Sequence, residues 1–247
     1  MNEPTIEVTQ PTAPPPIGEI HIYAGRLDHD EATVERLTAL LSPAERLLAK
    51  RRVTPELRRR AILSRGFLRA ALGASLERAP VEITLNLGKH GKPFFLEPDD
   101  AALLDFNVTH SGDLWLCALT ATGPVGIDIE TPRDETDWNA LVERYFSEAE
   151  GQAFAALPEN RKKEAFFRTW VTKEAFLKAR GSGLTTPLRD FDVEVNPDAP
   201  VALLAVRIPE EHVEAWWCLE VTGCGAPAVV AGRGTKPKVL LATLDPS

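Results

Sequence analysis

One short segment, residues 125–130 (VGIDIE), constrains this chain more than any other because it alternates apolar and acidic side chains. Alternation of this kind predicts a strand, in which neighbouring side chains point to opposite faces. Asp128 and Glu130 then share one face, roughly 7 Å apart. Two carboxylates at that spacing can bind one hard cation. The strand therefore predicts part of a metal site.

A helix over residues 160–180 supplies a third acid. At about 100° per residue, Glu174 falls in the middle of the apolar stripe that Phe167, Trp170 and Val171 form. A carboxylate in such a stripe is unfavourable unless a cation or hydrogen bonds satisfy it. Together with the two acids of the strand, Glu174 indicates a magnesium site made of three carboxylates.

Several motifs in a fixed order identify a family. They are residues 91–93 (GKP), 106–111 (FNVTHS), 125–130 (VGIDIE), 170–178 (WVTKEAFLK) and 181–184 (GSGL). The pattern resembles the 4′-phosphopantetheinyl transferases of the Sfp type, which move the phosphopantetheine arm of coenzyme A onto a serine of a carrier protein. The likeness runs from about residue 42 to about residue 195. Ala175 directly follows Glu174, and in this the chain resembles the branch of the family that has Ala at that position.

The resemblance implies an α+β fold, a pseudo-dimer of two similar α/β halves with the active site between them. Residues 18–124 are expected to form the N-terminal half, and residues 125–247 the C-terminal half that carries the metal site. Residues 1–17 hold five prolines without apolar periodicity, which predicts a disordered or extended arm.

The expected elements repeat in the order strand, helices, strands. Ser42 with Glu45, and Ser147 with Glu150, have the spacing of capping boxes that open helices. Helices are expected from residue 31, from 43, over 55–74, over 147–156 and over 160–180. Strands are expected at 20–23, 81–86, 103–108, 114–120, 125–130, 191–195, 201–207, 215–222 and 239–242.

The reaction that the resemblance implies is attack by a carrier serine on the β-phosphorus of coenzyme A, which expels adenosine 3′,5′-bisphosphate. Asp128, Glu130 and Glu174 would hold Mg²⁺, and Glu174 could also accept the serine proton. Asp128, Glu174 and Lys178 are the expected catalytic residues. An alternative interpretation of Glu174 is a plain helix ion pair with Lys178 at the favourable i,i+4 spacing.

Basic and hydroxyl side chains of the motifs are expected to bind coenzyme A. By resemblance these are Arg60, Lys92, Thr109, His110, Lys173 and Lys178. The family more often has Ser where this chain has Thr109, and Thr keeps the hydroxyl. The alternatives are that Lys173 and Lys178 are solvated lysines, that His110 is a structural histidine, and that residues 91–93 form an ordinary Gly-Lys-Pro turn.

Residues 46–69 carry nine basic side chains against the single acid Glu56. This segment predicts a local positive face that would attract the phosphates of coenzyme A and an acidic carrier protein. Glu45 and Leu48 stand where some relatives have phosphate-contacting lysines, so Arg46 or Lys50 could replace those contacts. The alternative is a solvated basic helix face.

Composition fits a soluble, cytoplasmic enzyme, and the protein is expected to be a monomer. The chain has 247 residues with 44% hydrophobic content, and no apolar run approaches the ~20 residues that span a bilayer. Its three cysteines lack the spacing of a disulfide framework, and Cys117 and Cys218 are expected to be buried thiols. The net charge of −8 argues against nucleic-acid binding.

The sequence therefore predicts a Mg²⁺-dependent 4′-phosphopantetheinyl transferase, a holo-[acyl-carrier-protein] synthase, with coenzyme A and apo acyl or peptidyl carrier proteins as its partners. Two other functions stay open. One is a non-catalytic module that binds coenzyme A or a carrier protein. The other is a metal-dependent diphosphate hydrolase, which would release phosphopantetheine without any carrier.

Overall fold

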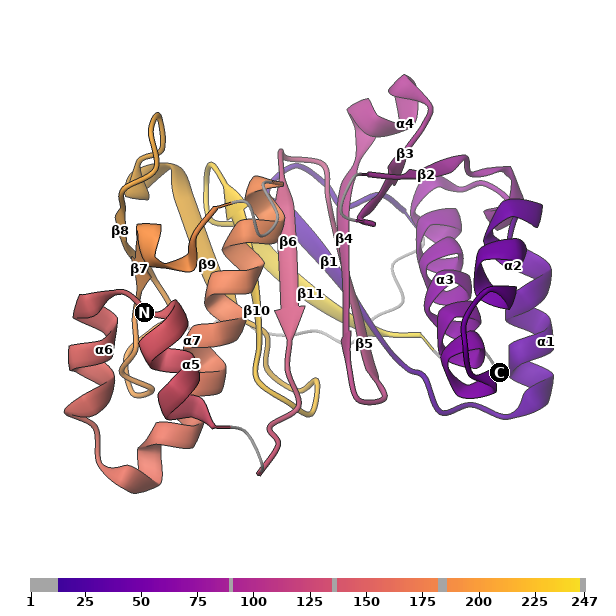
Figure 1. Cartoon of the computed structure of the whole chain (residues 1–247). Helices are drawn as coiled ribbons and strands as arrows, with labels where there is room; N and C mark the ends of the chain where they lie inside the picture. Colours follow the sequence, from indigo (N-terminus) through magenta and orange to yellow (C-terminus); the bar gives the residue numbers. More distant parts are fainter. Residues whose placement is uncertain (1–12, 89–90, 135–136, 182–185, 245–247) are drawn as a thin grey trace. The chain divides into compact units, whose positions relative to one another are not determined.

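The computed structural model describes residues 13–88, 91–134, 137–181 and 186–244, which form two compact units (Figure 1). The first unit holds the chain up to Val108, Asp113–Ala121 and the end of the chain from Pro237. The second holds Thr109–Gly112 and Thr122–Lys236. Most of the proline-rich arm and three residues of the 181–184 motif lie outside the described residues.

The first unit is built on a sheet with the order β11-β1-β5-β4. Strand β1 runs antiparallel to β5, with Ile22 opposite Ala118, and parallel to β11, with Ile22 opposite Leu241. The strands of the unit are β1 (Glu19–Arg26), β2 (Leu85–Leu87), β3 (Pro93–Phe95), β4 (Asp105–Ser111), β5 (Leu114–Thr120) and β11 (Lys238–Thr243). Its helices are α1 (Glu31–Leu40), α2 (Pro43–Lys50), α3 (Pro55–Leu76), α4 (Pro98–Leu103) and the short η1 (Pro80–Glu82).

Helix α3 supplies much of the core of the first unit. Leu63 and Phe67 are fully buried in the same cluster as Tyr23 and Trp115 of the sheet. The capping box expected at the start of α2 is confirmed, because Ser42 and Glu45 form it. The Thr54 side chain caps α3. Strand β4 ends in the second unit, since the unit boundary follows Val108.

The second unit combines the antiparallel sheet β6-β10-β9 with a two-stranded sheet of β7 and β8. Its strands are β6 (Val125–Ile129), β7 (Phe191–Val193), β8 (Leu203–Val206), β9 (Trp216–Glu220) and β10 (Ala228–Arg233). Its helices are α5 (Trp138–Tyr145), α6 (Glu148–Ala155), α7 (Glu159–Arg180) and the short η3 (Leu188–Asp190) and η4 (Val213–Ala215).

Helix α7 is the central element of the second unit and lies along β6 and β10 (Figure 1). Its buried side chains include Val171 and Phe176, which share a core with Phe191 and Trp216. Gly181 ends the helix with φ 73°, in the left-handed region that favours glycine. None of the described helices is both long enough and apolar enough to cross a lipid bilayer.

The α+β class and the division into two parts agree with the expectation. The expected halves differ from the structure at the end of the chain, because β11 pairs with β1 and so belongs to the first unit instead of the C-terminal half. β10, the middle strand of the second sheet, is not among the expected strands. Cys117 and Cys218 are buried free thiols, as predicted.

Candidate active site

The candidate site begins where α7 lies directly on β6. A Cβ added to Gly126 would stand 2.2 Å from both the carbonyl oxygen of Ala175 and the backbone nitrogen of Ala179. Real Cβ atoms do not come that close to backbone atoms, so only glycine allows this approach. The glycine of the VGIDIE motif therefore brings the backbone of α7 against the strand that carries Asp128.

Lys178 of α7 binds β6 at this contact. Its ammonium pairs with Asp128 Oδ1 at 2.6 Å and donates to the carbonyl oxygen of Ile127 at 3.1 Å. It also donates to Thr109 Oγ1 at 3.1 Å, and that hydroxyl donates to Asp128 Oδ1 at 3.0 Å. Asp128 is 7% exposed, so these bonds satisfy a charge that burial would otherwise penalise.

Glu174 lies one turn before Lys178 on α7 and has no ion pair among the described residues. Burial raises the pKa of Glu174, the charge of Asp128 raises it further, and Lys178 partly opposes both. A carboxyl group with a raised pKa holds a proton more readily than an exposed glutamate does. The ion pair of Lys178 is thus with Asp128, not with Glu174.

Glu130 follows directly after β6. Its backbone nitrogen donates to the carbonyl oxygen of Pro227 at 3.1 Å, and its carboxylate lies 3.7 Å from Nη2 of Arg133. Burial raises the pKa of Glu130, a hydrogen bond from Ser111 lowers it, and the charge of Asp128 raises it. Both glutamates of the expected site therefore lie within the electrostatic field of Asp128.

The three carboxylates expected to hold one metal ion are not gathered around a common point in the described residues. Within the described ranges, no three Asp, Glu, His or Cys side chains stand close enough together to ligate one ion. The charge of Asp128 is paired instead with the Lys178 ammonium, through Oδ1. The donor set still fits magnesium, which is usually held by one or two carboxylates together with substrate phosphates and water.

His110 and Thr109 are neighbours on β4 and point in different directions. Thr109 is buried against Asp128, whereas His110 is exposed. Alternation along a strand explains the difference, because successive side chains point to opposite faces. Thr109 thus bonds to Asp128 inside the unit, whereas His110 is open to solvent.

Lys173 does not join this cluster, although the family resemblance implies that it binds coenzyme A. Its ammonium is fully buried and pairs with Glu150 at 2.7 Å. It also donates to the carbonyl oxygens of Leu188 at 2.8 Å and Phe191 at 2.7 Å. Three donors with three protein acceptors leave none for a phosphate. This position does not match a phosphate-binding role.

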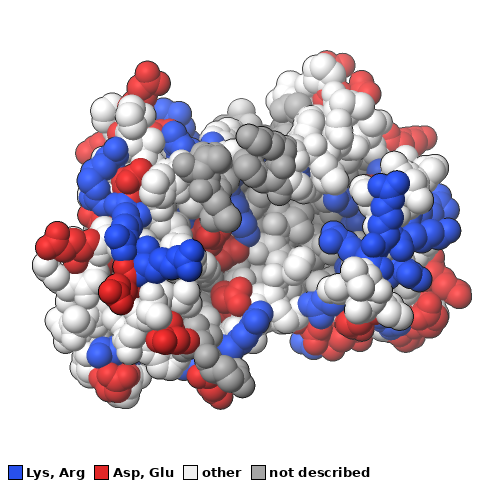
Figure 2. Space-filling model, in the orientation of Figure 1, with Lys and Arg blue, Asp and Glu red and all other residues white. Residues whose placement is uncertain are grey.

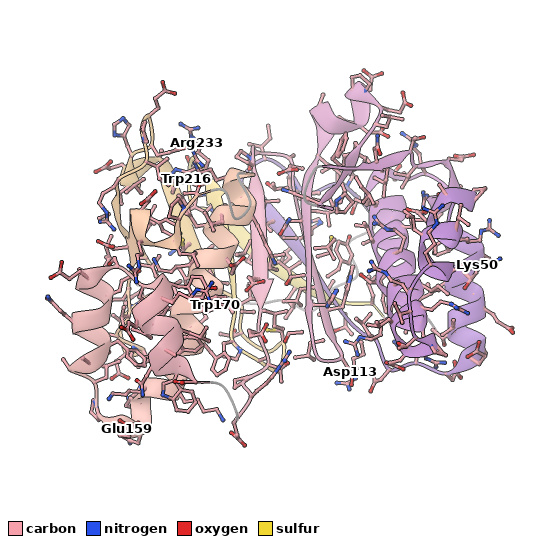
Figure 3. All side chains as sticks on the ribbon, viewed as in Figure 1. Lys50, Asp113, Glu159, Trp170, Trp216 and Arg233 are labelled. Carbon is pink, nitrogen blue, oxygen red and sulfur yellow. The ribbon has the colours of Figure 1, made fainter. Side chains whose placement is uncertain are left out.

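Arg60 and Lys92 belong to the first unit. Arg60 of α3 pairs with Asp113 at 2.7 Å and lies 3.8 Å from Glu56. Asp113 lies at the turn between β4 and β5 (Figure 3). Lys92 is partly exposed and leads into β3. Both cations lie at the surface of their own unit, where a phosphate can approach them.

The basic segment divides into an exposed part and a buried part. Lys and Arg side chains gather over α2 and the start of α3 (Figure 2), where Arg46, Lys50, Arg51, Arg52 and Arg58 are exposed. By contrast, Arg69 is 2% exposed and pairs with Glu45 at 2.6 Å, and Arg65 lies 3.5 Å from the same carboxylate. Glu45 therefore anchors two arginines of α3 besides closing the capping box of α2.

Sequence reasoning missed two residues that shape the site. Gly126 has no role of its own among the expectations, although a glycine inside a strand is a known signal of close backbone approach. Glu150 was recognised only as part of a capping box, and its ion pair with Lys173 joins residues far apart in the chain. Nothing in the local sequence pattern indicated that pair.

Comparison with known proteins gives relatives for both units. The profile of the 4′-phosphopantetheinyl transferase superfamily matches residues 124–230, and the profile of the 4′-phosphopantetheinyl transferase N-terminal domain matches residues 29–122. The 4′-phosphopantetheinyl transferase HetI of Nostoc sp. is 35% identical over 223 residues, which are 89% of this chain and 91% of the relative. The 4′-phosphopantetheinyl transferase Sfp of Bacillus subtilis is 29% identical over 178 residues, 72% of this chain and 75% of the relative. With matches of this length across both units, the chain belongs to the 4′-phosphopantetheinyl transferase family, in its Sfp-type branch.

Proposed function

We propose that this protein transfers the 4′-phosphopantetheine group of coenzyme A to a serine of an apo carrier protein and releases adenosine 3′,5′-bisphosphate. One observation carries the proposal within the structure: Glu174, a half-buried carboxyl group without an ion pair among the described residues, stands in the field of the Asp128–Lys178 pair. The relatives, which are named as transferases of this kind, support the same reaction.

In the proposed reaction, the serine oxygen forms a bond to the β-phosphorus of coenzyme A. The bond between that phosphorus and the bridging oxygen breaks, and the electron pair leaves with adenosine 3′,5′-bisphosphate. Glu174 takes the serine proton, a task that its raised pKa suits. Lys178, which is 28% exposed at its side chain, offers positive charge to the diphosphate oxygens.

Asp128 with Glu130 or Glu174 would hold Mg²⁺, with diphosphate oxygens and water completing its coordination. When bound, the ion neutralises charge on the diphosphate and polarises its phosphorus–oxygen bonds. Thr109 and Lys178 keep the Asp128 carboxylate in one orientation through their bonds to Oδ1. The chain would thus supply one oriented carboxylate, and not a complete set of metal ligands.

The proposal is tested by intact-mass measurement of apo carriers incubated with the protein, coenzyme A and Mg²⁺. We expect a gain of one phosphopantetheine group per carrier, with adenosine 3′,5′-bisphosphate as the second product. Fatty-acid, polyketide and peptide carriers are assayed separately, because the narrower activity of an acyl-carrier-protein synthase requires the first of these to react. Carriers that all stay at the apo mass contradict the proposal. Free phosphopantetheine formed without a carrier would indicate a hydrolase instead.

Arg60 and His110 are proposed to bind the 3′-phosphate of coenzyme A. Replacing either by Ala should raise the KM for coenzyme A more than the KM for dephospho-coenzyme A, because only the first substrate carries that phosphate. Arg58→Ala is the matched control for Arg60→Ala, since Arg58 is an exposed arginine on the same helix. Equal effects on the two substrates would place the contact at the diphosphate or make the residue structural.

A further inference from the structure

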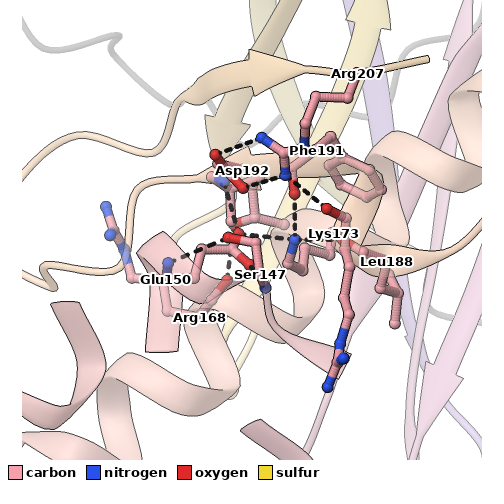
Figure 4. Close-up of polar contacts among 11 residues, drawn as sticks. Ser147, Glu150, Arg168, Lys173, Leu188, Phe191, Asp192 and Arg207 are labelled. Carbon is pink, nitrogen blue, oxygen red and sulfur yellow. Dashed lines mark hydrogen bonds and ion pairs between the residues drawn. The ribbon is translucent and has the colours of Figure 1, made fainter. Parts of the chain in front are cut away.

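A buried ion pair joins α7 to three other elements of the second unit (Figure 4). Glu150 of α6 accepts from Lys173 through Oε1 at 2.7 Å and from the backbone nitrogen of Val193 at 2.8 Å. Its Oε2 accepts from the backbone nitrogen of Ser147 at 2.9 Å. The two carboxylate oxygens therefore connect α6, β7 and α7 at one point.

The hydrogen bonds of Lys173 hold α7 in one orientation. Its ammonium donates to the carbonyl oxygens of Leu188 and Phe191, and it lies 4.3 Å from the centre of the Phe191 ring. Lys173 and Glu150 are 0% and 2% exposed at their side chains. Each ammonium hydrogen thus has a fixed acceptor on η3, β7 or α6, and Lys173 can keep all three only in one placement of α7.

Stability alone does not explain such a pair. Removing two charges from water is costly, and well-packed apolar side chains often stabilise a core as well as a buried ion pair does. Apolar side chains do not fix a helix in one orientation, because hydrophobic contacts tolerate rotation and sliding. The pair is therefore better explained by the placement of α7 than by its contribution to stability.

We infer that the Lys173–Glu150 pair is a positioning device that fixes the rotation of α7 and so sets the position of Glu174 relative to Asp128. Lys173 and Glu174 are consecutive residues, about 100° apart around the helix. A rotation of α7 that breaks the bonds of Lys173 also moves Glu174. This inference rests on the proposed function, since its effect is read as a transfer rate.

The test removes both charges together. In Lys173→Met/Glu150→Gln, no unpaired charge is left in the core, so the variant should fold. Its melting temperature should be lower than that of the wild type, because the carbonyl oxygens of Leu188 and Phe191 lose their donor, and kcat is therefore measured below that temperature. We expect its kcat to fall about 10- to 100-fold, because displacements of about 1 Å from reacting groups have effects of that size. The KM for coenzyme A should change less than about threefold, since most of its proposed contacts lie elsewhere.

Arg168→Met is the matched control on the same helix. Arg168 is 5% exposed and also donates to backbone carbonyls, those of Asn196 at 3.1 Å and of Ala199, so it is an equally buried cation of α7. We expect the control to lower the melting temperature and to leave kcat within about twofold of the wild type below that temperature. If the control lowers kcat as much as the double variant does, the special role of Lys173 is excluded.

A double-mutant cycle then shows whether the pair acts through Glu174. When the pair is removed in a Glu174→Gln background, kcat should fall less than about threefold further, because the group being positioned is already lost. The same 10- to 100-fold loss in that background would overturn the inference, as would a double variant with wild-type kcat. Failure of the wild type to modify any carrier would instead contradict the proposed function, so the two failures are distinct.

Discussion

Glu174→Gln should lower kcat by about 10²- to 10⁴-fold, the usual loss when a general base is removed. Glutamine keeps the shape and a hydrogen-bonding oxygen, but it cannot accept the serine proton or contribute charge to a metal ion. The fold should be unaffected, because Glu174 has no ion pair among the described residues and its burial penalises the charged form. Turnover of an apo carrier measures the effect of the change on catalysis, and thermal melting measures its effect on the fold.

The competing interpretation of Glu174 is a helix ion pair with Lys178, for which Gln would lower stability by only about 0.5 kcal/mol and leave turnover near the wild-type value. The structure already weakens that interpretation, because Lys178 pairs with Asp128. Glu164→Gln is a suitable control, since Glu164 is an exposed acid on the same helix in an i,i+3 pair with Arg161. Equal turnover in both variants would remove Glu174 from the mechanism.

Local patterns predicted the elements that carry the site. Residues 125–130 and 160–180 form β6 and α7, and both capping boxes are present as their spacing indicated. These features depend on side-chain alternation and on contacts three residues apart, which the sequence shows directly. The strand near residue 239 is also present as β11, although its partner β1 lies at the other end of the chain.

Other features depend on contacts between distant residues and could not be predicted in the same way. β10 is a run of small apolar residues after Pro227, without alternation, because it lies between β6 and β9 and is buried on both faces. The burial of Lys173 likewise requires Glu150 of another helix. In the sequence, Lys178 falls on the same helix stripe as Glu174, but no pattern indicates that Lys173 is buried.

Gly126→Ala should disturb the site as severely as the loss of a catalytic group. The added methyl group would lie 2.2 Å from two backbone atoms of α7, at Ala175 and Ala179, and backbone atoms cannot rotate aside as a side chain can. The helix must therefore move away from β6. That movement would break the bonds from Lys178 to Ile127 and Asp128, which are 3.1 and 2.6 Å long.

We expect Gly126→Ala to destabilise the second unit by about 3 kcal/mol or more, which corresponds to a melting temperature roughly 6 to 12 °C lower. Gly151→Ala is the matched control, because a Cβ at Gly151 of α6 meets no atom within 4 Å and alanine favours helices by up to about 1 kcal/mol. Below the melting temperature, the folded fraction of Gly126→Ala should still transfer phosphopantetheine poorly, whereas Gly151→Ala should match the wild type. Normal turnover by folded Gly126→Ala would show that the close contact of α7 with β6 is not what places Lys178 and Glu174 beside Asp128.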